Sequence, residues 1–460
     1  MLFNSLVFVV FFVLLYTIYW QLNSRFQKLT ILLGSLIFYG YWDVFFLIHF
    51  LLIVFVNFLF YHYANYKFNK TNITLVVIFN MLNLVFFKYF YFLINIVTDI
   101  FGFQQIAEVT TKLPNIILPL AISFYTFQIL AFQIDVYRGK IQSKVTLEDF
   151  TIFIMFFPQL IAGPIMRHTD FFKQLHGKKR FLELPYNAGG YLILLGVLKK
   201  VIIADNISPV IEPFFSHPEN YDTFSALVSI YGFAIQIYCD FSGYCDIARG
   251  LALLLGYDIP VNFNAPYFST SLKEFWQRWH ITLSQWLRDY LYIALGGNRF
   301  GNFRTYFNLL ITMILGGLWH GANYTFLVWG ALHGIYLIVE RVFTNNQKQS
   351  QKVLIQVFKG LIVFHLVCLA WIFFRIEHIH DIQSIVANLV SQSGTRMPET
   401  PKLLRLIGVG FLLHTYEYFQ SHVSLKFEYR KLLLPGLAIL CGVLVLTLAS
   451  NSAQFIYFQF

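Results

Sequence analysis

The longest uncharged run of this chain, Thr305–Val339, has a histidine near its middle. The run contains 35 residues, whereas one helix needs only ~20 to cross a bilayer. Three glycines surround His320, so we predict two helices with a break at Gly316–Ala322. His320 lies 16 positions after Arg304, which is about 24 Å along a helix at ~1.5 Å per residue. That distance places His320 deep in a hydrocarbon layer ~30 Å thick.

An ionisable side chain at that depth usually faces the protein interior or a water-filled cavity, and it is a functional candidate by default. The alternative is a structural histidine that bonds to a backbone carbonyl freed at the break. The position of His320 favours function, and its spacing alone leaves the structural interpretation open.

The composition of this chain is that of a membrane protein. Of its 460 residues, 57% are hydrophobic and 12% charged, whereas soluble domains carry about 25% charged residues. We therefore predict an all-α polytopic membrane protein, a single domain over residues 1–460, with roughly 10–13 membrane segments. The net charge of +10 fits basic cytoplasmic loops rather than a nucleic-acid surface. The four cysteines have no CxxC or zinc spacing, so we predict neither disulfides nor a metal site: Cys239, Cys245, Cys368 and Cys441.

Several apolar runs allow more than one path through the membrane. Leu2–Trp20 is the expected first span and should be retained as an anchor. Leu29–Phe60 forms either one kinked helix or two helices that turn back at Tyr41–Asp43. Lys88 is expected to snorkel to the interface, although it could face the interior. The remaining expectations are a re-entrant or tilted segment at Phe150–Ile165 and a final span at Leu432–Leu448.

Charged residues also interrupt apolar sequence elsewhere. Lys199 and Lys200 must snorkel, line a cavity or pair with an acid such as the nearby Asp205. Further along, Asp240 and Asp246 lie in apolar sequence, and Arg249 follows Asp246 on the same helix face. This second group forms either an internal ion pair or part of a substrate tunnel.

A second histidine, His280, lies in a different setting. Ser271 and Glu274 form a capping box ahead of it. An aromatic side and a polar stripe (Lys273, Gln277, Ser284 and Arg288) then predict one amphipathic helix, with His280 at the edge between them. Such a helix lies in the membrane interface or lines an entrance. His280 is therefore either functional or a hydrogen-bonding residue of an interfacial helix.

Four blocks of sequence identify a resemblance. They are FPQLIAGPIMR (157–167), IQIYCDFSGYCDIARGLALLLGYDIPVNFNAPY (235–267), FWQRWHITLSQWLRDYLYIALGGNR (275–299) and GGLWHGANYTFLVWGALHG (316–334). These blocks resemble membrane-bound O-acyltransferases of the bacterial branch that acetylates alginate or peptidoglycan or D-alanylates teichoic acid. The chain departs from the pattern at Ala294, where proline is common, and at Cys245, where serine is usual.

The resemblance implies a helical body around a tunnel, with His320 as the catalytic histidine and His280, at the first polar position of the pattern, as the second catalytic residue. It implies that Asp240, Asp246, Arg249, Trp279, Trp319 and Asn323 support the tunnel. Acetyl-CoA would be the donor substrate, and no cofactor would stay bound. Arg278, Arg288 and Arg299 would either meet the phosphates of coenzyme A or form a solvated interfacial face.

The C-terminal tail adds a further expectation. Residues 454–460 contain FIYFQF, which resembles the motif of the small peptide in D-alanylation systems. By that resemblance Tyr457 takes the acyl group as an ester and passes it to an exported partner.

The function that the resemblance implies is O-acetylation of an exported glycan from the bacterial inner membrane, with an extracytoplasmic SGNH-type acyltransferase as partner. Membrane lipids surround the protein, and no nucleic acid is expected. The alternative enzyme is a D-alanyl transferase that uses a carrier protein. A transporter is the non-enzyme alternative, and it predicts inverted repeats, which the sequence does not display.

Overall fold

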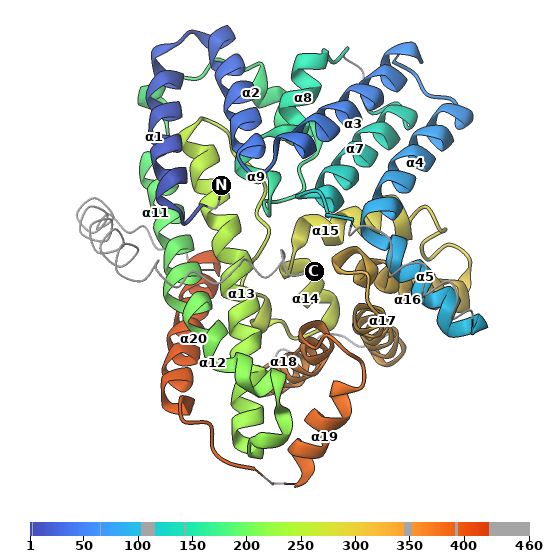
Figure 1. The fold of residues 1–460 in the computed structure, drawn as a ribbon, viewed down its shortest axis with the longest axis vertical. Coiled ribbons are helices and arrows are strands. Elements are labelled where there is room, and N and C mark those ends of the chain that lie inside the picture. Colours follow the sequence, from blue (N-terminus) through green and yellow to red (C-terminus); the bar gives the residue numbers. More distant parts are fainter. Residues whose placement is uncertain are drawn as a thin grey trace. The chain divides into compact units, whose positions relative to one another are not determined.

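The computed structural model describes residues 1, 3–64, 66–102, 116–141, 144–344, 352–391 and 394–422. These residues are predominantly helical, and their only β-pairing is an isolated bridge between Tyr221 and Thr395 (Figure 1). The predicted all-α class is confirmed. The expected span Leu432–Leu448 and the tail 454–460, with Tyr457, lie outside the described residues.

Six helical stretches among the described residues are long and apolar enough to cross a membrane. α1 (Leu6–Gln21) is a shorter apolar helix. The predicted polytopic membrane protein agrees with this finding. The six stretches are Val44–Tyr63, Lys70–Phe101, Tyr186–Ser216, Thr223–Leu254, Tyr324–Phe343 and Val353–Arg375.

The internal contacts divide the chain into two compact units. The first comprises Met1–Leu184 with Ala252–Pro260, and the second comprises Pro185–Leu251 with Val261–Phe460. The helices of the first unit are α1 (Leu6–Gln21), α2 (Ser24–Gly40), α3 (Val44–Tyr63), α4 (Lys70–Leu84), η1 (Val85–Tyr89), α5 (Phe90–Phe101), α7 (Ile122–Tyr137), α8 (Leu147–Met155), α9 (Phe157–Leu160), α10 (His168–Leu175) and η2 (Phe181–Glu183).

The turn between α2 and α3 decides between the two predicted paths. α2 ends at Gly40, and Asp43 caps α3 by accepting a hydrogen bond from the Phe46 N–H at 2.9 Å. A side-chain acceptor at this position satisfies one of the free N–H groups of a helix start. The chain therefore turns back at Tyr41–Asp43, as the second path predicts.

Lys88 differs from its prediction. It lies in η1, a π-helical interruption between α4 and α5, and its Nζ donates to Ser123 Oγ on α7 at 3.3 Å. α4 packs against α7, which brings that acceptor close (Figure 1). The snorkelling prediction is thus wrong, because a π-turn aims the lysine at a hydroxyl inside the unit.

Short helices replace a full crossing after residue 146. α8 has nine residues and α9 has four, and all residues of α9 are buried. Pro158 lies at the start of α9, where a missing N–H costs no helical hydrogen bond. Two such short elements agree with the prediction that Phe150–Ile165 does not cross as one straight helix.

The second unit holds both histidines. α11, η3 and α12 form one continuous stretch, in which the π-helical η3 carries Lys199 and Lys200. α13 and α18 are long helices of the same unit, and a buried cluster around Trp279, Trp329 and Trp371 forms its core. The elements are α11 (Tyr186–Val197), η3 (Leu198–Ala204), α12 (Asp205–Ser216), η4 (Pro218–Asn220), α13 (Thr223–Leu254), η5 (Pro266–Phe268), α14 (Leu272–Arg278), α15 (Ile281–Trp286), η6 (Leu287–Tyr292), α16 (Gly301–His320), α17 (Tyr324–Thr344), α18 (Val353–Arg375), α19 (Asp381–Ser391) and α20 (Thr400–His422).

Candidate active site

His320 is the last residue of α16, and the next helix, α17, begins at Tyr324. The side chain of His320 is only 5% exposed. The interruption lies at residues 321–323, so the predicted break at the histidine is confirmed, although it begins later than Gly316.

Gly316 and Gly317 have a different role from the one predicted. They continue α16, and a Cβ on Gly317 would overlap the Phe326 carbonyl oxygen on α17. From the opposite side, a Cβ on Gly330 would overlap the Met313 carbonyl oxygen. Glycines at such positions let two helix backbones approach closely. Gly317 and Gly330 therefore let α16 pack closely against α17 in the turns before His320.

Aromatic rings surround His320. The ring centroids of Trp319, Trp329 and Phe374 lie 5.0, 5.1 and 5.2 Å from that of His320. Trp319, one of the predicted support residues, also lies 5.7 Å from the ring of His280. The imidazole thus sits in a buried site walled by aromatic rings, where electrostatic interactions with a reacting group are stronger than in water.

The helix predicted around His280 is wrong at the histidine itself. Ser271 caps α14 as predicted, accepting from the Glu274 N–H at 3.0 Å, but α14 ends at Arg278. His280 then adopts the left-handed conformation, with φ 41° and ψ 54°, ahead of α15. A residue with a Cβ pays for this conformation, and such strain concentrates at functional sites. Both histidines therefore lie at helix interruptions.

Asn262 fixes the orientation of His280, which is fully buried. The Asn262 Oδ1 accepts from the Thr282 N–H at 3.1 Å and lies 3.2 Å from His280 Nδ1. Because that oxygen is an acceptor, Nδ1 is the protonated nitrogen of the neutral ring. Nε2 then carries the lone pair and is the basic nitrogen. The sequence offered no signal for Asn262.

The two imidazoles lie together. Their ring centroids are 6.5 Å apart, and the His280 ring also contacts Phe241 at 4.7 Å. Two residues 40 positions apart in sequence thus converge on one buried place, as the resemblance implied. Two bases at this separation are able to act on one bound group.

Acid should destabilise the protein partly through His280. Burial lowers the pKa of this imidazole to about 3, whereas an unfolded histidine titrates near 6.5. Between those pH values the unfolded chain binds a proton that the folded chain does not. The free energy of unfolding therefore decreases as the pH is lowered from about 6.5 toward 3. We expect His280→Gln to reduce this loss by up to about 1.4 kcal/mol per pH unit. Thermal unfolding between pH 4 and 7 measures it, and parallel curves for both proteins would contradict it.

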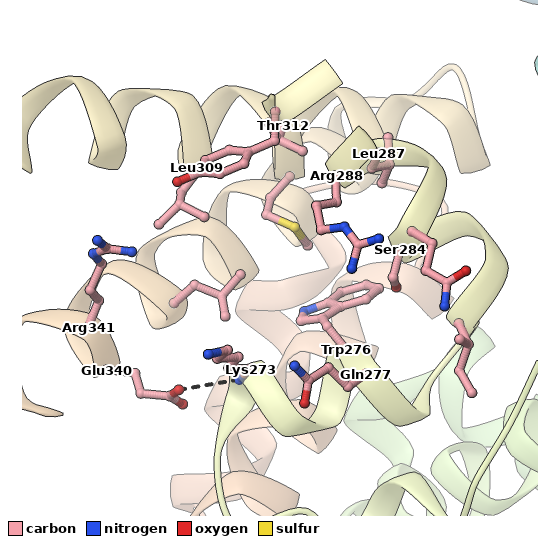
Figure 2. Close-up of a pocket in the computed structure, with 15 residues that line it drawn as sticks. Lys273, Trp276, Gln277, Ser284, Leu287, Arg288, Leu309, Thr312, Glu340 and Arg341 are labelled. Carbon is pink, nitrogen blue, oxygen red and sulfur yellow. Dashed lines mark hydrogen bonds between the residues drawn. The ribbon is translucent and has the colours of Figure 1, made fainter. Parts of the chain in front are cut away.

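A cavity of about 620 Å³ lies in the same unit as the two histidines. The predicted polar stripe of Lys273, Gln277, Ser284 and Arg288 lines it, together with Thr312 and Met313 of α16 (Figure 2). Glu340 lies at its edge and accepts from the Lys273 backbone N–H at 3.3 Å. The expectation that the stripe lines an entrance is therefore supported by its position on one cavity wall.

Neither histidine is among the residues that line this cavity. Trp276 is a lining residue, its ring lies 5.8 Å from that of Trp329, and Trp329 in turn contacts His320. Two indoles therefore stand between the cavity and His320. The tunnel that the resemblance implied remains a prediction.

The three arginines expected at the donor have different positions. Arg288 lines the cavity. Arg278 pairs with Glu274 at 2.9 Å and donates to the Asn264 carbonyl at 3.2 Å, while Arg299 is exposed in the turn before α16. The cavity lining also contains Lys273, which the sequence analysis named only as part of the polar stripe, and Arg341, which it missed.

Buried ion pairs occupy the predicted acidic positions of α13. Lys200 contacts Asp205 at 2.7 Å and Asp240 at 2.6 Å, and Lys199 contacts Asp246 at 2.7 Å. These contacts confirm the pairing that Asp205 suggested. Arg249 is half-buried one turn beyond Asp246.

Glu417 of α20 completes the Lys199 pair and accepts from the Tyr238 hydroxyl. It was missed, although a single acid in an apolar helix was the available signal. The paired groups lie near the histidines along α13, because Asp240 directly precedes Phe241, whose ring contacts His280.

The remaining support residues are structural in different ways. Trp279 is buried against Trp371 at 4.9 Å, and Asn323 donates to the Glu377 carbonyl at 2.7 Å while accepting from the Thr325 N–H. His333 was missed. It is fully buried on α17 with the rings of Trp329 and Trp276 at 4.8 and 5.0 Å.

Comparison with known proteins identifies a family pattern. A family model described as MBOAT, the membrane-bound O-acyltransferase family, matches residues 141–378. A probable alginate O-acetylase AlgI from Pseudomonas aeruginosa is 39% identical over 392 residues, which are 82% of this chain and 73% of the relative. A peptidoglycan O-acetyltransferase from Helicobacter pylori is 33% identical over 436 residues, 86% of this chain and 80% of the relative.

A more distant relative carries a different acyl group in its description. A teichoic acid D-alanyltransferase from Bacillus subtilis is 28% identical over 282 residues, 58% of this chain and 71% of the relative. The matched region of the family model includes His280, His320 and every lining residue of the 620 Å³ cavity, called the larger cavity below.

Proposed function

The chain belongs to the membrane-bound O-acyltransferase family, and from this premise we propose that it passes an acetyl group from cytoplasmic acetyl-CoA across the bacterial inner membrane to an exported glycan. Family membership makes it a multi-pass membrane O-acyltransferase. Relatives described as acting on alginate and peptidoglycan support a polysaccharide acceptor. Their identity exceeds that of the D-alanyltransferase, which supports acetyl transfer.

The observation that carries this proposal is the pair of buried histidines with centroids 6.5 Å apart at two helix interruptions. In the proposed reaction His320 removes the proton of the acceptor hydroxyl as its oxygen attacks the thioester carbonyl. The new C–O bond replaces the C–S bond, and the proton passes to the departing thiolate. A general base contributes typically 10²–10⁴-fold to such a step. His280, oriented by Asn262, is proposed to hold the reacting group through Nε2.

The larger cavity is proposed to hold the donor. Lys273, Arg288 and Arg341 line it, and guanidinium groups suit phosphate oxygens because they bind two at once. Arg278 and Arg299 are weaker candidates, because they are not lining residues.

Neutralising the cavity should raise the KM for acetyl-CoA. We expect Arg288→Gln and Arg341→Gln each to raise it about tenfold with little change in kcat, since a charged hydrogen bond contributes about 1.5–3 kcal/mol. Steady-state kinetics in proteoliposomes measure this, with Arg299→Gln as the matched control. A larger effect from Arg299→Gln would contradict the placement of the donor.

The tail is proposed to carry the acyl group onward. Tyr457 would accept the acetyl group as an ester, and an extracytoplasmic SGNH-type acyltransferase would transfer it to the glycan. This relay rests on the FIYFQF motif.

A deletion strain tests the function. Mass spectrometry of its cell-wall and exopolysaccharide fractions should show loss of O-acetyl groups from one glycan, and the intact gene should restore them. Unchanged acetylation in every fraction, with loss of D-alanyl esters instead, would favour the D-alanyl alternative.

A further inference from the structure

A second cavity lies in the first unit, and neither His280 nor His320 lines it. Its volume is about 220 Å³. Arg25, Lys28 and Lys179 supply three cations to its lining, against a single lining carboxylate, Glu148. The other lining residues are Tyr19, Ser24, Gln27, Leu175, His176, Gly177 and Tyr257.

Neighbouring groups compensate only part of this charge. Lys28 Nζ lies 3.2 Å from Asp149 Oδ1 and 3.1 Å from His176 Nδ1. His176 Nε2 lies 3.3 Å from the other Asp149 oxygen, so that carboxylate is shared between Lys28 and His176. The cavity therefore keeps an excess of positive charge.

Lys179 contacts an aromatic ring and a backbone carbonyl. Its Nζ lies 3.8 Å from the centroid of the Tyr257 ring and donates to the Gln174 carbonyl at 2.8 Å. Burial, and then the charge of Lys28, lower the pKa of Lys179 to about 8. A bound anion would raise the pKa of Lys179 again, because an opposite charge favours the ammonium form.

The start of α2 adds further positive potential to the cavity. Ser24 and Arg25 are the first residues of this 17-residue helix, and both line the cavity. The N-terminus of a helix presents free N–H groups and a partial positive charge, which suit an anionic oxygen. Two independent features, the side chains and the helix start, thus point to the same ligand charge.

Apolar groups adjoin the basic cavity. Trp20, next to the lining Tyr19, has its ring 5.5 Å from that of Phe181, and Leu182 is 91% exposed. Further along α1, Ile18 and Leu14 are 53% and 59% exposed. A ligand that fits this surface has an anionic head and a hydrocarbon chain beside it.

We propose that this cavity binds the phosphate of an anionic phospholipid, with an acyl chain lying along α1 against Trp20 and Phe181. Basic pockets at a membrane surface recognise such head groups. The site is independent of the acyl-transfer chemistry, and its ligand stabilises the folded protein by mass action.

Native mass spectrometry and thermal unfolding of the full chain in neutral detergent test the proposal with phosphatidylglycerol as the probe. Phosphatidylglycerol should bind and raise the Tm, and phosphatidylcholine should not. Arg25→Gln and Lys179→Gln should each weaken phosphatidylglycerol binding about tenfold, whereas Lys179→Arg should retain it. Lys67→Gln, an exposed lysine of the same unit, is the matched control and should bind normally.

Three results would overturn the proposal. Equal binding of phosphatidylcholine would show that charge is irrelevant, and equal loss in Lys67→Gln would show that the cavity is not the site. A Tm increase of the same size with inorganic phosphate alone would identify a site for soluble phosphate. Arg25 is exposed, so its substitution tests binding without disturbing the core.

Discussion

Replacement of His320 by alanine is expected to abolish glycan O-acetylation while the protein remains in the membrane. The imidazole is 5% exposed at the end of α16, and Trp319, Trp329 and Phe374 surround it. None of these three rings carries a basic group that could replace the lost imidazole, so we expect a decrease of at least about 100-fold. Acetyl-ester release from isolated glycan, together with a membrane immunoblot, measures both parts of the expectation.

Control variants distinguish loss of the catalytic base from any general effect of replacing a histidine. His217→Ala removes a histidine that is 69% exposed in its side chain, and it should retain full activity. Tyr457→Phe should also abolish acetylation if the tail carries the acyl group. An active Tyr457→Phe variant would remove the relay but leave His320 as the base, whereas an active His320→Ala variant would falsify the mechanism.

Loss of Lys200 should have the largest effect on stability. The ammonium contacts Asp205 and Asp240, and the side chains of all three residues are at most 6% exposed. Lys200→Met removes the cation from between two buried carboxylates, which typically costs about 3–5 kcal/mol. Thermal unfolding of the purified protein should show a clear decrease in Tm.

The compensating variant makes this result specific. Lys200→Met combined with Asp205→Asn and Asp240→Asn removes the buried charges together, so it should recover much of the loss. Arg180→Gln breaks an exposed pair with Glu183, whose side chains are 73% and 65% exposed, and such pairs contribute little. A Lys200→Met protein as stable as the original would show that the ion pairs do not hold these helices.

Features that depend on local sequence were predictable. The uncharged run and its glycines predicted the break at His320, the turn at Tyr41–Asp43 was one of two predicted paths, and pairing with Asp205 was one of three alternatives for Lys199 and Lys200. Each is a short-range consequence of hydrophobic length, helix capping or charge. The resemblance added the pairing of His320 with His280, which hydropathy could not supply.

Features that depend on distant packing were not predictable. The pattern around His280 is continuous at helical spacing, yet Asn262 binds the backbone and side chain of Thr282 and the ring of His280. That competition replaces helical hydrogen bonds and permits the left-handed residue. Gly317 illustrates the same limit, because only the partner helix reveals that it serves close packing.

The indole rings of Trp276 and Trp329 bear on how well the membrane keeps its ion gradients. A permanently open aqueous channel through a membrane enzyme would let protons and sodium ions run down their gradients. In this protein the rings of Trp276 and Trp329, with centroids 5.8 Å apart, occupy the line of contacts from the larger cavity to His320. If the donor enters through this cavity, as proposed, its thioester arm would have to displace one ring, whereas a hydrated ion would first have to shed its hydration shell.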